Sequence, residues 1–139
     1  MAGSIVVGYD ASPGARAALD QALELAAAFG DRLIIGFGVA PPAPVGEEVR
    51  AHRQALRDHA EKMTAEALER AQGSGVDVEV ALVEDRASSA LVSLAAENDA
   101  RMIVVGSYGE RPVKGAILGS TPHKLLHLAE RPVLVVPAV

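Results

Sequence analysis

Five short apolar runs alternate along this chain with four segments that have the residue spacing of helices. Runs of this length are typical of buried strands, and they cover residues 5–9, 33–39, 76–83, 102–105 and 133–136. Strands that alternate with helices predict a parallel sheet with helices on both faces. Because 139 residues fit one domain, we predict a single α/β domain, residues 1–139, with a doubly wound five-stranded sheet.

The predicted helices have recognisable ends. Ser12 is a good N-cap with Pro13 at the first helical position, and Gly30 is a typical C-terminal stop. The next two helices are expected at residues 47–71 and 87–97. The last helix is expected at residues 122–129, because an N-cap hydroxyl (Ser120 or Thr121) would precede Pro122.

The stretch from Met102 to Thr121 carries the strongest functional signal. A buried strand ends at Gly106, further glycines follow at 109 and 119, and Ser120 and Thr121 stand before the last helix. Glycines let the backbone approach a ligand closely, and a helix N-terminus offers free N–H groups and a partial positive charge. The combination predicts an anion site, and phosphate is the natural anion. It is neither a Walker P-loop nor the Rossmann G-x-G-x-x-G pattern.

The pattern G-x-x-G, nine residues, G-[S/T] closely resembles the ATP-binding motif of the universal stress protein family. The resemblance extends over essentially the whole chain, from IVVGYDASPGARAALDQALELA to GST-PHKLLHLAERPVLVVP. It implies ATP as ligand, with or without Mg²⁺, a homodimer and a cytoplasmic protein. Residues 5–8 and 103–106 are also the same tetrapeptide, Ile-Val-Val-Gly. The echo and the resemblance together predict strand order 3-2-1-4-5, with these two strand ends at the switch point where open α/β sheets bind ligands.

The resemblance also implies site residues. Asp10 would lie near the ribose and contact the ribose or a metal ion, although the alternative is an acid that caps the first helix or holds the turn before it. Gly8 and Val39 would line the adenine pocket, and Val105 and Gly106 would lie beneath the nucleotide. The phosphate loop would comprise Gly109, Gly119 and Ser120, with Thr121 adding an N–H and a hydroxyl.

Two residues depart from the family pattern. Pro122 stands where the family usually has a residue with an N–H, so that one donor is missing. Glu84 stands where glycine is frequent, and it would repel phosphates if it faced the pocket.

The composition argues against some partners and compartments. The net charge of −5 and only two Tyr and two Phe argue against nucleic-acid binding, and the absence of Cys fits a reducing compartment. We see no signal peptide and no run long enough to span a bilayer. The apolar edge run Val133–Val136 is the expected homodimer contact.

No nucleophile elbow or paired-carboxylate set stands out. We therefore expect a nucleotide-dependent regulatory protein rather than an efficient enzyme. Two alternatives stay open: slow ATP hydrolysis or self-phosphorylation on Ser120 or Thr121, and binding of AMP or cyclic AMP.

Overall fold

Five parallel strands and four helices alternate in the computed structural model, which describes residues 3–39, 46–108 and 118–138. The strands are β1 (Ser4–Gly8), β2 (Arg32–Gly38), β3 (Val78–Val83), β4 (Ile103–Gly106) and β5 (Val133–Val136). The helices are α1 (Pro13–Phe29), α2 (Gly46–Ala71), α3 (Ala87–Glu97) and α4 (Ser120–Leu128). The sheet order is β3-β2-β1-β4-β5 and every pair is parallel, which confirms the predicted fold class and topology.

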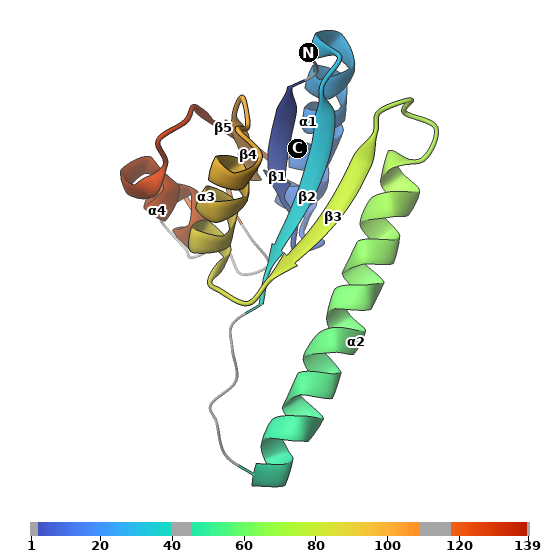
Figure 1. Cartoon of the computed structure of the whole chain (residues 1–139), viewed down its shortest axis with the longest axis vertical. Helices are drawn as coiled ribbons and strands as arrows, with labels where there is room; N and C mark the ends of the chain where they lie inside the picture. Colours follow the sequence, from blue (N-terminus) through green and yellow to red (C-terminus); the bar gives the residue numbers. More distant parts are fainter. Residues whose placement is uncertain (1–2, 40–45, 109–117, 139) are drawn as a thin grey trace.

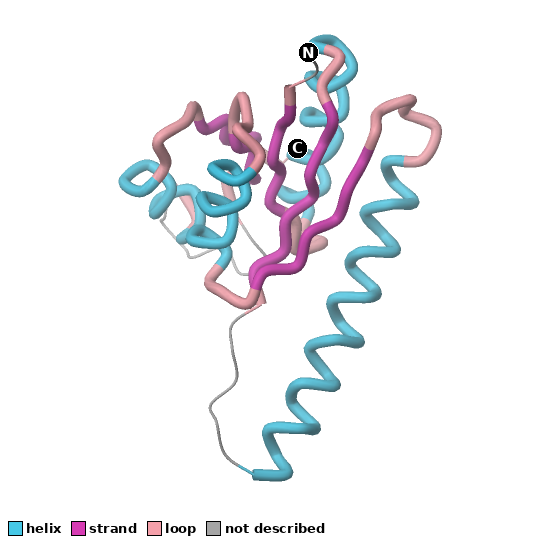
Figure 2. Tube along the Cα trace, viewed as in Figure 1, coloured by secondary structure: helices cyan, strands magenta, loops and turns pink. Residues whose placement is uncertain are grey.

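The helices cover both faces of the sheet (Figures 1 and 2). One buried cluster joins α1 and the C-terminal half of α2 to the sheet, and a second joins α3 and α4 to its other face. The N-terminal half of α2 extends beyond the strands (Figure 1). No helix in the described ranges combines the length and the apolar character that crossing a bilayer would require.

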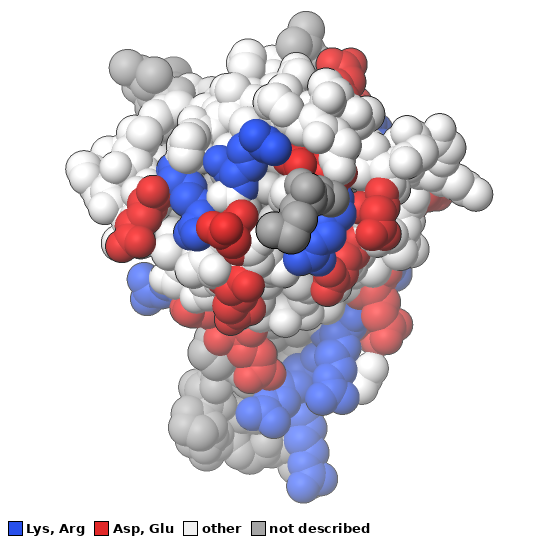
Figure 3. Space-filling model, turned by 45° about the horizontal axis from the view of Figure 1, so that its top comes forward, with Lys and Arg blue, Asp and Glu red and all other residues white. Residues whose placement is uncertain are grey.

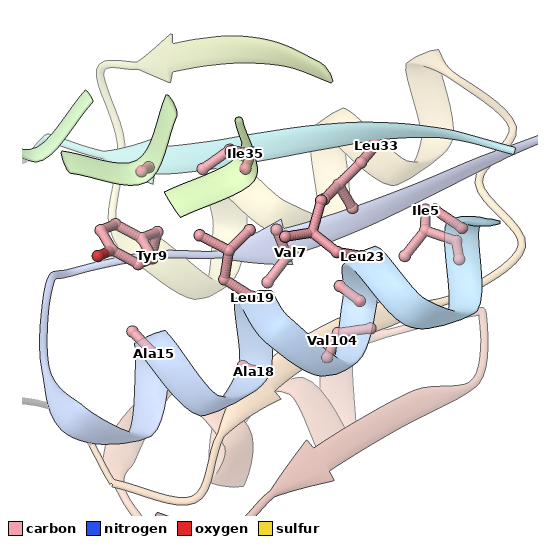
Figure 4. Close-up of a cluster of buried hydrophobic side chains, with 14 of the residues drawn as sticks. Ile5, Val7, Tyr9, Ala15, Ala18, Leu19, Leu23, Leu33, Ile35 and Val104 are labelled. Carbon is pink, nitrogen blue, oxygen red and sulfur yellow. The ribbon is translucent and has the colours of Figure 1, made fainter. Parts of the chain in front are cut away.

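Small residues on α1 explain how closely this helix approaches the sheet. Ala18, Leu19, Ala22 and Ala26 are fully buried, and their four- and three-residue spacing places them on one face. Figure 4 shows side chains of β1, β2 and α1 meeting in one layer, with Val7, Leu19 and Ile35 among them. This packing fixes the start of α1 at the carboxyl ends of β1 and β4.

The helix ends agree with the sequence at α1 and differ at α4. Ser12 caps α1 by accepting a hydrogen bond from the Ala15 N–H, and Gly30 ends the helix in the left-handed conformation. The prediction that α4 begins at Pro122 was wrong, because α4 begins at Ser120 with Gly119 as its N-cap and no side-chain cap. Pro122 therefore occupies the third helical position, where its missing N–H costs no intrahelical hydrogen bond.

Candidate functional site

A cavity of about 370 Å³ opens at the carboxyl ends of β1, β2 and β4, beside the switch point between β1 and β4. The ends of three strands, the starts of α1, α3 and α4 and one residue of α2 form its wall. The sequence-predicted residues in this wall are Gly8, Asp10, Val105, Gly106, Gly119, Ser120 and Thr121. The structure thus brings together seven of the nine candidate residues, which come from both ends of the chain.

The start of α4 is held in place by β4. The Gly119 N–H donates to the Ser107 carbonyl at 2.6 Å, and the His123 N–H closes the first helical turn onto the Gly119 carbonyl at 3.2 Å. The N–H groups of Ser120 and Thr121 have no acceptor among the described residues, and Pro122 has no N–H. Two free N–H groups and two hydroxyls therefore belong to residues of the cavity wall.

Asp10 organises the turn between β1 and α1. Its Oδ1 accepts from the Ser12 N–H at 3.0 Å and from the Ser12 hydroxyl, and the same hydroxyl oxygen accepts from the Ala15 N–H at 3.1 Å. Asp10 therefore holds the turn before α1, which was one of the two roles expected for it from the sequence. Asp10 Oδ2 has no partner in the described part of the chain, so one carboxylate oxygen stays available in the cavity wall.

Ala11, between Asp10 and Ser12, has φ = 61°. A non-glycine residue in this left-handed region carries roughly 1–2 kcal/mol of strain. The strain lies in the turn that aims Asp10 at the cavity.

Gly106 is required by packing as well as by its place in the wall. A Cβ atom at Gly106 would lie 2.5 Å from the carbonyl carbon of Gly14 and 2.7 Å from its oxygen. The backbone of β4 therefore touches the backbone of α1 at this point. The sequence predicted a glycine here for close approach of a ligand, and it gave no sign of this backbone contact.

A polar cluster of Tyr9, Arg16 and Glu66 joins α2 to the cavity and was missed by sequence reasoning. The Tyr9 hydroxyl donates to Glu66 Oε1 at 2.7 Å, and Arg16 Nε donates to the same oxygen at 2.6 Å. Tyr9, which follows β1, and Met63, which lies on α2, also line the cavity. The cluster joins the C-terminal half of α2 to the end of β1 and the first turn of α1.

Burial and the neighbouring Glu66 carboxylate raise the pKa of Tyr9 to about 12, while Arg16 acts in the opposite direction. We expect Glu66→Gln to move the Tyr9 pKa down toward its ordinary value near 10 but not to reach it, because burial is the larger cause. Ultraviolet absorbance of the phenolate against pH, in a Tyr108→Phe background, measures this. The contribution of Tyr9 to stability is complete below pH 10 and is lost as the pH rises through the folded-state pKa.

One candidate residue lies outside the cavity wall. Val39 lines a second hollow of about 800 Å³ between α2 and β3, and Glu84 lies there too, so Glu84 is not part of the cavity wall. Gly109 lies outside the described residues. The described residues contain no group of three or more His, Asp or Glu placed to hold a metal ion.

Charges are mixed over the face that Figure 3 shows, where acidic and basic side chains alternate on the body of the molecule. Basic side chains gather on the extending part, where α2 exposes Arg50, Arg53 and Arg57. The described cavity wall contains no Lys or Arg, so its positive potential comes from the helix starts of α1, α3 and α4 through N–H groups rather than side-chain cations.

The model of the universal stress protein family matches residues 1–137. The chain belongs to this family. A universal stress protein of Mycobacterium tuberculosis is 34% identical over an alignment of 143 positions, which includes 96% of this chain and 94% of the relative.

Solved structures agree with this assignment. A universal stress protein in complex with cAMP is 32% identical, with a TM-score of 0.75 over 99% of this chain and 98% of that one. A hypothetical protein whose biochemical function was assigned from its structure has a TM-score of 0.88 at 22% identity, over 99% and 96% of the two chains. The second likeness supports the universal stress protein fold alone.

Proposed function

We propose that this universal stress protein binds ATP in the 370 Å³ cavity and acts as a nucleotide-dependent regulatory module formed by the whole chain. The observation that carries the proposal is the start of α4, where two N–H groups without a described acceptor and two hydroxyls belong to the cavity wall. Such a helix start stabilises a phosphate group through hydrogen bonds and the helix dipole. The cavity also lies beside the switch point of the sheet, where ligands of open α/β folds bind.

In this proposal the phosphates contact the N–H and hydroxyl groups of Ser120 and Thr121. The free oxygen of Asp10 accepts a hydrogen bond from a ribose hydroxyl, and the adenine lies against the ends of β1 and β2. A Mg²⁺ ion would be held mainly by phosphate oxygens and water, because the described residues offer no multidentate acidic group. Regulation further requires that ATP bind two states of the protein with different affinity.

Cyclic AMP or AMP is a second candidate ligand. A relative with 32% identity has been solved in complex with cAMP, and the two free N–H groups of α4 are enough to bind one phosphate group. Direct competition between ATP and cyclic AMP for the purified protein separates the two candidates.

The first experiment is to denature freshly purified protein and identify any released nucleotide. ATP alone supports a binder that seldom hydrolyses it, whereas ADP alone supports slow hydrolysis and AMP or cyclic AMP supports the second candidate. If the protein is empty, calorimetric titration with ATP and with cyclic AMP follows. Absence of binding at millimolar concentration of both ligands would contradict the proposal.

Ser120→Glu should weaken ATP binding at least tenfold without destabilising the protein. A carboxylate at the first helical position favours the helix by interacting with its dipole, but it repels the phosphates from the same N–H groups. Calorimetry measures the affinity and urea unfolding measures the stability. Ser93→Glu is the matched control, because it makes the same charge change at an exposed position of α3 outside the cavity wall. Equal affinities of the two variants would argue against phosphate binding at α4.

We also propose that the protein forms a homodimer through β5. This strand lies at the edge of the sheet, and Leu134 in its middle is exposed. An apolar edge strand is usually paired or covered. Light scattering at micromolar concentration should give the dimer mass for the parent and the monomer mass for Leu134→Lys. A monomeric parent would refute the dimer without affecting the nucleotide proposal.

For location, we propose the cytoplasm, which the lack of cysteine supports. Microscopy of the tagged protein in intact cells tests this proposal.

A further inference from the structure

Two histidines face one another on the solvent side of α4. His123 and His127 are one helical turn apart and both are exposed, and their ring centroids lie 5.5 Å apart at an interplanar angle of 76°. Residues four apart lie on the same face of a helix. Neither histidine belongs to the wall of the cavity, so the pair is separate from the proposed nucleotide site.

Neither imidazole makes a hydrogen bond or ion pair within the described part of the chain. Each neutral imidazole therefore keeps a nitrogen lone pair available to a ligand in solvent. Metal ions bind imidazole nitrogen at about 2.0–2.1 Å, and rings already in contact need only small side-chain rotations to present two nitrogens to one ion. A pre-formed pair loses less side-chain entropy on binding than two separated histidines.

We propose that His123 and His127 form a binding site for a divalent transition-metal ion that prefers imidazole, such as Zn²⁺, Ni²⁺ or Cu²⁺. The two histidines supply two ligands, and water fills the remaining positions. Affinity should follow the general order for nitrogen ligands, with Cu²⁺ above Ni²⁺ and Zn²⁺. Mg²⁺ should not bind here, because it requires oxygen ligands.

Metal binding at this site should stabilise α4. His123 and His127 lie on successive turns of this nine-residue helix, so a bound ion links these two turns to each other. An ion that binds the folded helix more tightly than the unfolded chain raises the melting temperature in a concentration-dependent way. Ser120 and Thr121 precede His123, so the ion would also restrain the helix start that lies in the cavity wall.

The chain contains its own control pair. His52 and His59 are also exposed and both lie on α2, but they are seven residues apart, roughly 10.5 Å along the helix axis. Two imidazoles at that separation cannot bind one ion without bending the helix. His52→Ala/His59→Ala therefore removes as many histidines as His123→Ala/His127→Ala and leaves the proposed site intact.

The test is calorimetric titration of nucleotide-free, chelator-treated protein without a polyhistidine tag, using ZnCl₂ and NiCl₂, together with melting curves. We expect about one ion per chain and a rise of a few degrees in melting temperature at saturating metal. His123→Ala and His127→Ala should each weaken binding about tenfold or more and abolish the rise, whereas the double control variant should behave like the parent. Since all four side chains are exposed, the variants should fold, which circular dichroism checks.

Binding that survives His123→Ala/His127→Ala, or that is lost in His52→Ala/His59→Ala, would overturn the proposal. Equal affinities for Mg²⁺ and Zn²⁺, or equal rises in melting temperature with MgCl₂ and ZnCl₂, would also overturn it. These outcomes do not depend on whether ATP binds.

Discussion

Gly106→Ala is expected to lower the free energy of unfolding by about 3 kcal/mol, near the upper end for overpacking. The added Cβ would lie 2.5–2.9 Å from three backbone atoms of Gly14. Backbone atoms at the first turn of α1 cannot move aside without shifting the whole helix, and α1 carries much of the core. The measurement is urea unfolding, read as a fall in the midpoint with an unchanged slope.

Gly8→Ala provides the matched control at the end of β1. Its Cβ would approach Leu91 Cδ1 at 2.8 Å and Val105 Cγ1 at 3.3 Å, which are the ends of side chains. Side-chain ends can rotate away, so we expect a loss of about 1 kcal/mol. Equal losses for the two variants would show that the backbone contact of β4 with α1 is not the cause.

Gly106 variants are poor probes of the nucleotide site. A Gly106 variant that fails to bind ATP does not establish a ligand contact, because the same change displaces the start of α1 and with it Asp10. Ser120→Glu is the better probe, since it alters charge at the helix start and leaves the packing between β4 and α1 unchanged.

Asp31→Asn is expected to cost about 2–3 kcal/mol of stability. The Asp31 side chain is only 1% exposed, and its oxygens accept from Arg101 Nε at 2.7 Å and from the Gly3 N–H at 3.0 Å. Arg101 also lies over the Phe29 ring, 4.3 Å from its centroid. The cluster joins the start of the chain, the end of α1 and the entry to β4. The asparagine amide has a similar shape but replaces one acceptor by a donor that would face Arg101.

The same residue should govern part of the acid sensitivity. The hydrogen bond from Arg101 lowers the pKa of Asp31 below its usual value, with burial opposing and the Gly3 N–H assisting. A carboxyl with a depressed folded-state pKa stabilises the protein fully above its unfolded pKa of about 3.9 and loses this contribution as the pH falls through the folded-state value. The free energy of unfolding, measured from pH 6 downward, should therefore fall more steeply in the parent than in Asp31→Asn. Parallel curves would contradict the assignment.

The residues alone determined the fold class and most element boundaries. Local signals carry this information: apolar runs of strand length, the Ser12-Pro13 start and Gly30 end of α1, and the repeated Ile-Val-Val-Gly at two strand ends. Such signals act over a few residues, so they can be read without knowing the neighbours in space. The strand order was predicted from the Ile-Val-Val-Gly repeat together with the family resemblance, which added the expectation that the two strand ends meet at one site.

Only the tertiary structure decided the contacts between distant segments. Tyr9 and Glu66 are 57 residues apart, and no local pattern couples them. Helix α4 begins at Ser120 and not at the predicted Pro122. The Gly119 N–H, just before this start, donates to the Ser107 carbonyl after β4, which is a contact between distant segments. Gly106 is a further example, because the close contact of β4 with α1 at this residue results from packing and not from residue spacing. Local propensity thus sets which elements form, and side-chain and backbone packing sets what each element touches.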